Sequence, residues 1–369
     1  MGAPAGTSLM AVPLAAGIAS AALTAWSIRY AQRRRLIDLP GQRRSHRVPT
    51  PRGGGIGIVI AVFASVWFVT ARSPAPDWLM ASAMAASIAL VGLVGWIDDH
   101  GGLAARWRFA AHCVAALVLV GAATFQIASM FLGELAPALP ATQLAMAAVI
   151  ASVGIVWSIN LHNFMDGIDG LLASQAMFVF AVLAFLSASA DAADLERAAL
   201  IGLAAAAGFA PFNFPRARIF LGDVGSGVLG LLIAVGVLVQ MNTPDIAWAS
   251  GWVACSAFVT DATCTLVSRM LRGRRWYSAH REHLYQWLVR SGFSHARVVA
   301  FYLGWNVLIA LPVVCWMNRA ATSAGDAAFE SRDGVGAAAI VYALAVFAWW
   351  AGKRWCLAAA RTRGAHADA

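Results

Sequence analysis

Long apolar runs, separated by short polar breaks, set the pattern of the whole 369-residue chain. A helix that crosses a membrane needs about 20 mainly apolar residues, and eleven runs of this kind are present. Because backbone polar groups must be paired within lipid, the runs predict helices. The predicted spans are residues 9–28, 53–71, 78–97, 108–126, 143–159, 171–190, 198–214, 225–241, 247–267, 297–317 and 334–352. We therefore predict an all-α, polytopic membrane helix bundle that forms one domain over residues 1–369.

Positive charge is divided unevenly between the two sets of loops that alternate along these spans. With the span-edge residues Arg108 and Arg297, one set holds 23 Lys and Arg, whereas the other holds only 4. Positively charged loops stay in the cytoplasm, so we expect the N-terminus outside and the C-terminus inside. The predicted cytoplasmic segments are residues 29–52, 98–107, 160–170, 215–224, 268–296 and the C-terminal tail.

Composition narrows the class of protein. With 60% hydrophobic and 12% charged residues, the chain has more apolar surface than a soluble core buries. No Lys or Arg precedes Arg29, so the first apolar run lacks the basic region of a cleaved signal peptide and is expected to remain as a span. The five cysteines have no paired spacing, which predicts neither a disulfide framework nor a zinc site.

Four polar segments interrupt the apolar pattern, and all of them fall on the predicted cytoplasmic face. The first is Asp98-Asp99, which follows the third span close to Arg106 and Arg108. Adjacent carboxylates at a span end can simply cap or solvate the boundary. Beside two arginines they are also typical of a metal–diphosphate site, in which carboxylates hold Mg²⁺ and cations neutralise phosphate oxygens.

The second segment, residues 160–171, concentrates amides, carboxylates and glycines in a short stretch. Asn163, Asp166 and Asp169 recur every three residues, which places neighbours on one face if a helix forms. Gly167 and Gly170 allow a sharp turn or the close approach of a ligand. An ordinary turn between spans is the alternative. Asp166 is expected either to bind metal or to orient its neighbours.

The third and fourth segments add an anion-binding loop and a cationic loop. Residues 220–227 form a glycine-rich stretch that leads into a helix, where backbone N–H groups can face an anion and Asp223 can hold a metal. His280, Arg281 and His283 suit phosphate recognition better than zinc binding, because the surrounding ligands are hard oxygens. The predicted cytoplasmic location is enough to explain much of the remaining basic charge of residues 268–296.

Two further features are less specific. In the first cytoplasmic loop, His46 and Arg52 are candidates for binding phosphate or anionic lipid. Asp261 is predicted to lie inside the ninth span, where a carboxylate is costly unless it faces a cavity or a partner, and its role stays open. A transporter is the competing class for such a chain, although the polar residues gather at one face rather than at the midplane.

Five motifs together resemble the polyprenyl-phosphate N-acetylhexosamine-1-phosphate transferases, the glycosyl transferase family 4. They are SHRVPTPRGGG (45–55), GWIDDH (95–100), NLHNFMDGIDGL (160–171), FLGDVGSG (220–227) and AHREHLYQ (279–286). The resemblance covers roughly residues 43–290. It implies a multi-pass enzyme of the bacterial inner membrane that transfers a sugar-1-phosphate from a UDP-N-acetylhexosamine to undecaprenyl phosphate, releasing UMP. It also implies Mg²⁺, with Mn²⁺ as an alternative, and no nucleic-acid partner. Dimers occur in the family, and the oligomeric state of this chain stays open.

The resemblance assigns roles to residues by their position in the motifs. Asp98 and Asp99 match the paired catalytic aspartates, and Arg108 stands where the family has a basic phosphate-binding residue. Asp223 and Asn163 match the metal ligands. The other matches are Phe220 stacking on uracil, Gly167 and Asp169 in the nucleotide pocket, and His280, Arg281 and His283 facing the diphosphate.

One departure from the family bears on the substrate. The phospho-N-acetylmuramoyl-pentapeptide transferases of peptidoglycan synthesis have three successive histidines where this chain reads His280-Arg281-Glu282-His283. The sequence therefore resembles more closely the branch that initiates O-antigen or related surface glycans, with the peptidoglycan enzyme as an alternative. We expect a single displacement at the donor's β-phosphorus, and a covalent intermediate on Asp98 or Asp99 is the competing mechanism.

Overall fold

The computed structural model describes residues 5–39, 48–133, 140–275, 280–324 and 327–367, and these are mostly helical. The elements are α1 (Ala5–Arg34), β1 (Ile37–Asp38), β2 (Thr50–Pro51), α2 (Ile56–Arg72), α3 (Trp78–Gly101), α4 (Ala105–Gly133), α5 (Ala141–Met165), α6 (Leu171–Ser189), α7 (Ala193–Asn213), α8 (Gly222–Met241), α9 (Ser250–Ala254), α10 (Ser256–Leu271), α11 (Leu284–Arg290), α12 (His295–Trp305), η1 (Asn306–Ala310), α13 (Leu311–Ala324) and α14 (Ala327–Ala367). The two short strands pair antiparallel. The prediction of an all-α helix bundle is confirmed.

Within the described residues, nine helical segments are long and apolar enough to cross a membrane, compared with eleven predicted spans. The predicted span 53–71 corresponds to α2, which has only 17 residues. The predicted span 247–267 is divided at Cys255 into the five-residue α9 and the 16-residue α10. The predicted span 297–317 is one continuous helical segment in which α12, the π-helical η1 and α13 follow each other.

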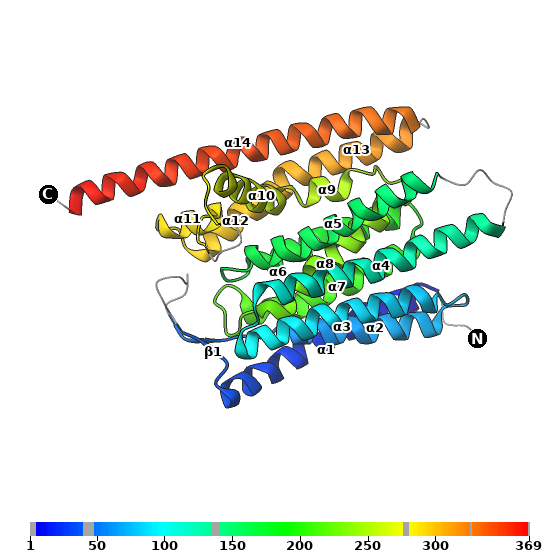
Figure 1. Cartoon of the computed structure of the whole chain (residues 1–369), viewed down its shortest axis with the longest axis horizontal. Coiled ribbons are helices and arrows are strands. Elements are labelled where there is room, and N and C mark those ends of the chain that lie inside the picture. The colour runs from blue at the N-terminus through cyan, green and yellow to red at the C-terminus, as the bar shows by residue number, and fades with distance from the viewer. Residues whose placement is uncertain (1–4, 40–47, 134–139, 276–279, 325–326, 368–369) are drawn as a thin grey trace.

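The helices lie side by side along the long axis of the molecule, and the chain reverses direction from one long helix to the next (Figure 1). The apolar helices α6 and α8 are the most buried of the bundle, whereas α4, α5 and α14 keep large apolar side chains on the outside. Helices with an exposed apolar face suit a lipid environment. Strand β1, helix α11 and the C-terminus lie at one end of the bundle, opposite the start of α1 (Figure 1).

Hydrogen bonds join the five predicted cytoplasmic loops to one another at this end. They run from Phe220 N to Pro51 O (2.8 Å), Gly54 N to Phe220 O (2.9 Å), Asp223 N to Asp99 Oδ1 (3.1 Å), Ala217 N to Asp169 Oδ2 (3.1 Å) and Tyr285 Oη to Phe164 O (3.0 Å). Loops that are far apart in the sequence therefore build one continuous surface, as expected for segments that share a membrane face.

Two glycines allow the helices that carry this surface to approach each other closely. A Cβ atom on Gly55, at the start of α2, would lie 2.3 Å from the Cα atom of Gly225 in α8. A Cβ atom on Gly95 in α3 would lie 2.5 Å from the backbone of Asp223. Any side chain at these positions would push α8 away from its neighbours. The glycines therefore set the position of Asp223 at the start of α8.

Candidate active site

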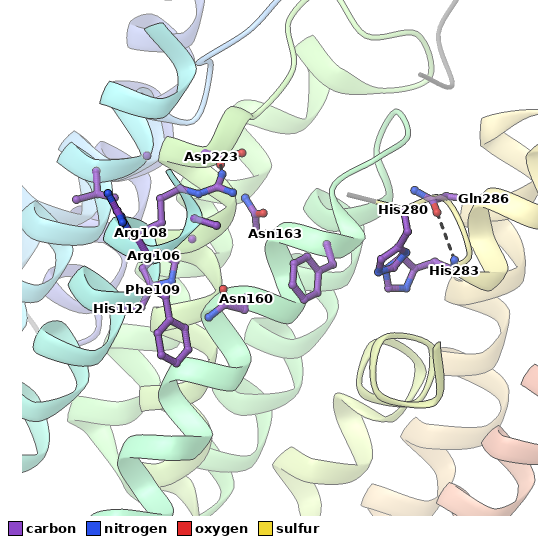
Figure 2. Close-up of a pocket in the computed structure, with 15 residues that line it drawn as sticks. Arg106, Arg108, Phe109, His112, Asn160, Asn163, Asp223, His280, His283 and Gln286 are labelled. Atoms are coloured by element: carbon purple, nitrogen blue, oxygen red, sulfur yellow. Dashed lines mark hydrogen bonds and ion pairs between the residues drawn. The ribbon is translucent and has the colours of Figure 1, made fainter. Parts of the chain in front are cut away.

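A cavity of about 530 Å³ opens at the loop end of the bundle, between α3, α4, α5, α8 and the segment that leads into α11. It is lined by Val94, Gly95, Ala105, Arg106, Arg108, Phe109, His112, Asn160, Asn163, Phe164, Asp223, Gly227, His280, His283 and Gln286. Figure 2 shows Arg108, Asn163 and Asp223 on one side, with His280, His283 and Gln286 on the other. The cavity therefore brings together residues from three of the predicted polar segments, and with them Arg106 and Arg108, which follow Asp98-Asp99 in the sequence.

One side of the cavity is lined by Arg108, Asn163 and Asp223. Asp98 does not line the cavity but is bonded to Arg108, and we call these four residues the carboxylate wall. The Arg108 guanidinium donates to Asp98 Oδ2 at 2.6 Å and to Asp223 Oδ2 at 2.5 Å through the same nitrogen, Nη1. Two carboxylates that the sequence separates by more than a hundred residues thus point at a single cation. Hydrogen bonds between charged groups are short and strong, so this arrangement holds α3, α4 and α8 together at the cavity.

Asp99 faces away from Asp98 although the two residues are adjacent. Its carboxylate is 4% exposed and accepts hydrogen bonds from the backbone N–H groups of Asp223 (3.1 Å) and Val224 (3.2 Å). These N–H groups belong to the first turn of α8, where an anion is favoured by unpaired donors and the helix dipole. Gly222 adopts φ +77°, and a Cβ atom there would lie 2.4 Å from Asp99 Oδ2. In this geometry Asp99 holds the backbone of Asp223, while Asp98 is bonded to Arg108.

Asn163 and Asp166 extend this wall at the end of α5. Asn163 Nδ2 donates to Ser226 Oγ of α8 at 2.9 Å, which keeps the amide beside Asp223 (Figure 2). Asp166 is the C-cap residue of α5. Burial, together with the negative charges of Asp223, Asp99 and Asp169, raises the pKa of Asp166 to about 8. A cation bound nearby would favour its ionised form.

The carboxylate wall has the chemistry of a Mg²⁺ site. Asp98 and Asp223 supply charged oxygens that converge on one point, and Asn163 adds a neutral amide oxygen in the same cavity. Hard oxygen ligands of this kind suit Mg²⁺ and Mn²⁺. Within the described part of the chain, no three His, Cys, Asp or Glu side chains are close enough to form a ready metal cluster. The Arg108 guanidinium lies between the two carboxylates, so a metal ion bound by both would require this side chain to move.

The opposite side, which we call the histidine wall, consists of His280, His283 and Gln286. The two imidazole rings lie 4.9 Å apart, centroid to centroid, and the His283 ring lies 6.2 Å from that of Phe164. Burial, with the nearby charges of His283 and Arg269, lowers the pKa of His280 to about 4. His280 is therefore neutral at pH 7 and offers a hydrogen bond rather than a positive charge. The Arg281 carbonyl accepts a hydrogen bond from Arg290 at 2.7 Å.

The residues assigned to nucleotide and phosphate binding lie outside the carboxylate wall and connect loops. Asp169 Oδ2 accepts from Ala217 N, and its Oδ1 lies 3.3 Å from His295 Nδ1. A Cβ atom on Gly167 would lie 2.1 Å from the Tyr285 hydroxyl. The backbone of Phe220 pairs with Pro51 and Gly54, and Arg52 N donates to Leu36 O at 3.1 Å. His46 lies outside the described residues. None of the four described residues with these assignments lines the cavity described above.

The cavity also contains residues that sequence reasoning did not single out, namely Phe109, His112 and Gln286. His112 is 9% exposed, lines the cavity and has no hydrogen-bond partner on Nδ1 within the described residues. Its position four residues after Arg108 is the signal that was available, because residues i and i+4 share a helix face. Asn160 lies opposite on α5, so these two residues form a polar floor one turn deeper than Arg108 and Asn163.

Comparisons with known proteins agree with the motif order. The model of glycosyl transferase family 4 matches residues 81–241. A decaprenyl-phosphate N-acetylglucosaminephosphotransferase of Mycobacterium leprae is 32% identical over 308 residues, which cover 76% of each chain. The chain belongs to glycosyl transferase family 4. Among its family members, the Mycolicibacterium smegmatis protein with the same name is 32% identical over 82% of this chain and 80% of its own length.

More distant family members carry related names. A Bacillus subtilis protein described as a probable undecaprenyl-phosphate N-acetylglucosaminyl 1-phosphate transferase is 27% identical and covers 76% of this chain and 79% of its own. Membership of this family makes the chain a sugar-1-phosphate transferase, and the nine long apolar helices of its described part make it a multi-pass membrane protein. The sequence-based predictions of the family and of the enzyme class are thus confirmed.

Proposed function

We propose that this family 4 transferase catalyses the Mg²⁺-dependent transfer of an N-acetylhexosamine-1-phosphate from a UDP-sugar to undecaprenyl phosphate. The products are undecaprenyl-diphosphate-sugar and UMP. The observation that carries the proposal is the convergence of Asp98 and Asp223 on Arg108, at a cavity that Arg108 and Asp223 line together with His280 and His283. A transfer between two phosphates requires carboxylates that can bind a metal ion and, across the cavity from them, groups that can bind phosphate.

The relatives support a choice among substrates. Their names specify N-acetylglucosamine and a decaprenyl or undecaprenyl phosphate, so N-acetylglucosamine is the first donor sugar to test. The His280-Arg281-Glu282-His283 segment favours initiation of O-antigen or a related surface glycan over the peptidoglycan step. We propose a bacterial inner-membrane location with the cavity on the cytoplasmic side, on the basis of the 23 to 4 division of Lys and Arg.

The residues suggest a single in-line displacement. An oxygen of the lipid phosphate attacks the β-phosphorus of the donor, and the bond from that phosphorus to the oxygen bridging it to the α-phosphate breaks as UMP leaves. Asp98 orients the attacking phosphate or accepts its remaining proton. Arg108 and Arg281 bind phosphate oxygens by charge, and His280 and His283 by hydrogen bonds. Bound at Asp223 and Asn163, Mg²⁺ would supply neutralisation of the negative charge on the diphosphate.

The deciding experiment uses membranes that contain the full-length protein, undecaprenyl phosphate and a panel of radiolabelled UDP-N-acetylhexosamines. Formation of lipid-linked sugar together with UMP is expected with at least one donor. Uptake of label into vesicles without a lipid product would instead indicate a transporter. Turnover of UDP-N-acetylmuramoyl-pentapeptide alone would identify the peptidoglycan enzyme. A phosphorylated protein isolated after incubation with donor, but without acceptor, would replace the single displacement by a covalent mechanism.

A further inference from the structure

Asp261 of α10 is the acidic residue whose role the sequence leaves open. The structure buries it to 2% exposure and surrounds its carboxylate with hydrogen-bond donors from four helices. The donors are Thr265 Oγ1 (3.2 Å), Leu284 N (2.7 Å), Tyr285 N (3.3 Å), Tyr302 Oη (2.7 Å) and Trp349 Nε1 (3.1 Å). A buried carboxylate is tolerated only when it is paired in this way.

The bonds to Leu284 and Tyr285 fix the point at which the histidine wall joins the bundle. These two N–H groups belong to the first turn of α11, and no carbonyl of their own helix is available to them. Tyr302 in α12 and Trp349 in α14 hold the other sides of the carboxylate. The start of α11 is therefore attached to three helices through one side chain.

His283 lies immediately before this attachment point. Its Nδ1 atom is 3.8 Å from Asp261 Oδ1, and its ring lines the cavity. On the other side of the attachment, the Tyr285 hydroxyl donates to the carbonyl of Phe164 at 3.0 Å. Asp261 thus determines how the histidine wall is spaced from α5 and from the carboxylate wall.

A purely structural role does not require a carboxylate here. Well-packed apolar residues often stabilise a core as much as a buried charge does. A carboxylate is needed only because the two backbone N–H groups and the three side-chain donors are all to be held at once, and its two oxygens accept from all of them. We propose that Asp261 is a positioning residue for the transfer reaction, which holds residues 283–285 so that His283 faces the substrate diphosphate. This inference rests on the proposed function, since the diphosphate is the ligand that the histidines would meet.

The test is a double-mutant cycle between Asp261→Asn and His283→Ala in the full-length protein. The amide in D261N would present one acceptor oxygen and a new donor to the same five donors, so the start of α11 should shift. Because a misplacement of about 1 Å can cost on the order of 10²-fold in rate, kcat should fall by about that factor in D261N. In the H283A background the same substitution should have little further effect, because the two residues act as a unit. Effects that multiply would overturn the inference, as would full kcat in D261N.

The matched control is Ser256→Ala, which removes another buried polar contact of α10, the 3.0 Å bond from Trp305. This variant should keep kcat close to that of the unmodified protein. Should D261N not fold, Tyr302→Phe leaves the Asp261 carboxylate in place and removes the hydroxyl that donates to it at 2.7 Å. It should lower kcat less than D261N does, and again only when His283 is present. Equal losses of kcat in Y302F with and without His283 would overturn the inference.

A second readout does not depend on the identity of the donor. His283 is 2% exposed, so its reaction with diethyl pyrocarbonate, followed by peptide mass spectrometry, should be slow in the unmodified protein and in S256A. The reaction should be faster in D261N or Y302F, and an unchanged rate would overturn the inference. If no UDP-sugar yields a lipid product, the proposed function fails, whereas these rates still decide whether Asp261 holds His283 in place.

Discussion

The two walls of the cavity are built in different ways. The residues of the carboxylate wall project from α3, α4, α5 and α8, which are long helices. Glycines allow α3 and α5 to approach α8 closely. The histidine wall lies on residues 280–286, just before α11 and in its first turn, and these residues are attached to α10 by polar contacts at Asp261 and Glu282. Rigid helices give the more precise site. The carboxylate wall is therefore suited to the reacting groups and the histidine wall to the recognition of substrate.

The adjacent residues Asp98 and Asp99 show the same division on a smaller scale. Asp98 takes part in the ion pair with Arg108, whereas Asp99 accepts two backbone N–H groups at the start of α8. One carboxylate is thus bonded to a side chain that lines the cavity, and the other supports the backbone of Asp223. Substitutions in the two walls, and of the two aspartates, should therefore differ in kind as well as in size.

The largest expected effect is that of Asp223→Asn in the carboxylate wall. The variant keeps the size of the side chain but removes the charge that faces Arg108 and the metal site, so kcat should fall on the order of 10³-fold. Binding of Mn²⁺, measured by electron paramagnetic resonance without substrate, should weaken as well. Asp194→Asn, at a side chain that is 98% exposed, serves as the control. Full activity of D223N at ordinary Mg²⁺ would mean that the metal binds elsewhere.

The next comparison sets Asp98→Asn against Asp99→Ala. D98N should lower kcat on the order of 10²-fold, the effect of a lost acid–base group, with little change in thermal unfolding. D99A leaves two buried N–H groups without an acceptor, which should cost about 1–3 kcal/mol of folding stability, and activity should fall because Asp223 shifts. Thermal unfolding in detergent together with kcat separates the two cases. Equal loss of stability in both variants would remove the distinction between the two carboxylates.

Much of the carboxylate wall could be predicted from the sequence, because the charges interrupt long apolar runs and the division of Lys and Arg places those interruptions on one face. Asp98, Arg108, Asn163 and Asp223 all lie at the ends of predicted spans, and the structure brings them together. Span ends that share a membrane face have little freedom to lie apart. Proximity therefore followed from topology alone.

The direction of individual side chains could not be predicted in this way. The turn of Asp99 toward α8 depends on the φ angle of Gly222, and the inclusion of His112 depends on the helical phase of α4. The five donors of Asp261 come from segments up to 88 residues away, which no local pattern specifies. The division of α9 from α10 at Cys255 also lies within an apolar run that reads as a single span.

A moderate effect is expected for Phe220→Ala, at a residue whose backbone joins the α7–α8 loop to the segment that leads into α2. If the ring stacks on uracil, its loss should cost about 1–3 kcal/mol of donor binding, which corresponds to roughly a fivefold rise of the donor KM at the lower end of this range. The acceptor KM should change much less. Steady-state kinetics with each substrate varied in turn measures both values, and Phe220→Trp should retain donor binding. An unchanged donor KM in F220A would exclude Phe220 from the nucleotide pocket.

The smallest effect tests how the histidine wall is attached through Glu282. Its carboxylate forms ion pairs with Arg269 and Arg274. Burial alone would raise the pKa of Glu282, but the two arginines outweigh it and hold the pKa below its usual value near 4.5. A lowered folded-state pKa means that the stabilisation is present above about pH 4.5 and is lost as the pH falls through the folded-state value.

Glu282→Gln should therefore lower the melting temperature slightly at pH 7, by the equivalent of less than about 1 kcal/mol because the site is partly exposed. The difference between E282Q and the unmodified protein should shrink as the pH falls below about 4.5. Thermal unfolding in detergent between about pH 3.5 and 7 measures both changes, with Glu196→Gln in the first turn of α7 as the control. A difference that grows toward acid pH would mean that Glu282 is not held ionised by the arginines. The attachment of the histidine wall to α10 would then depend mainly on the contacts of Asp261.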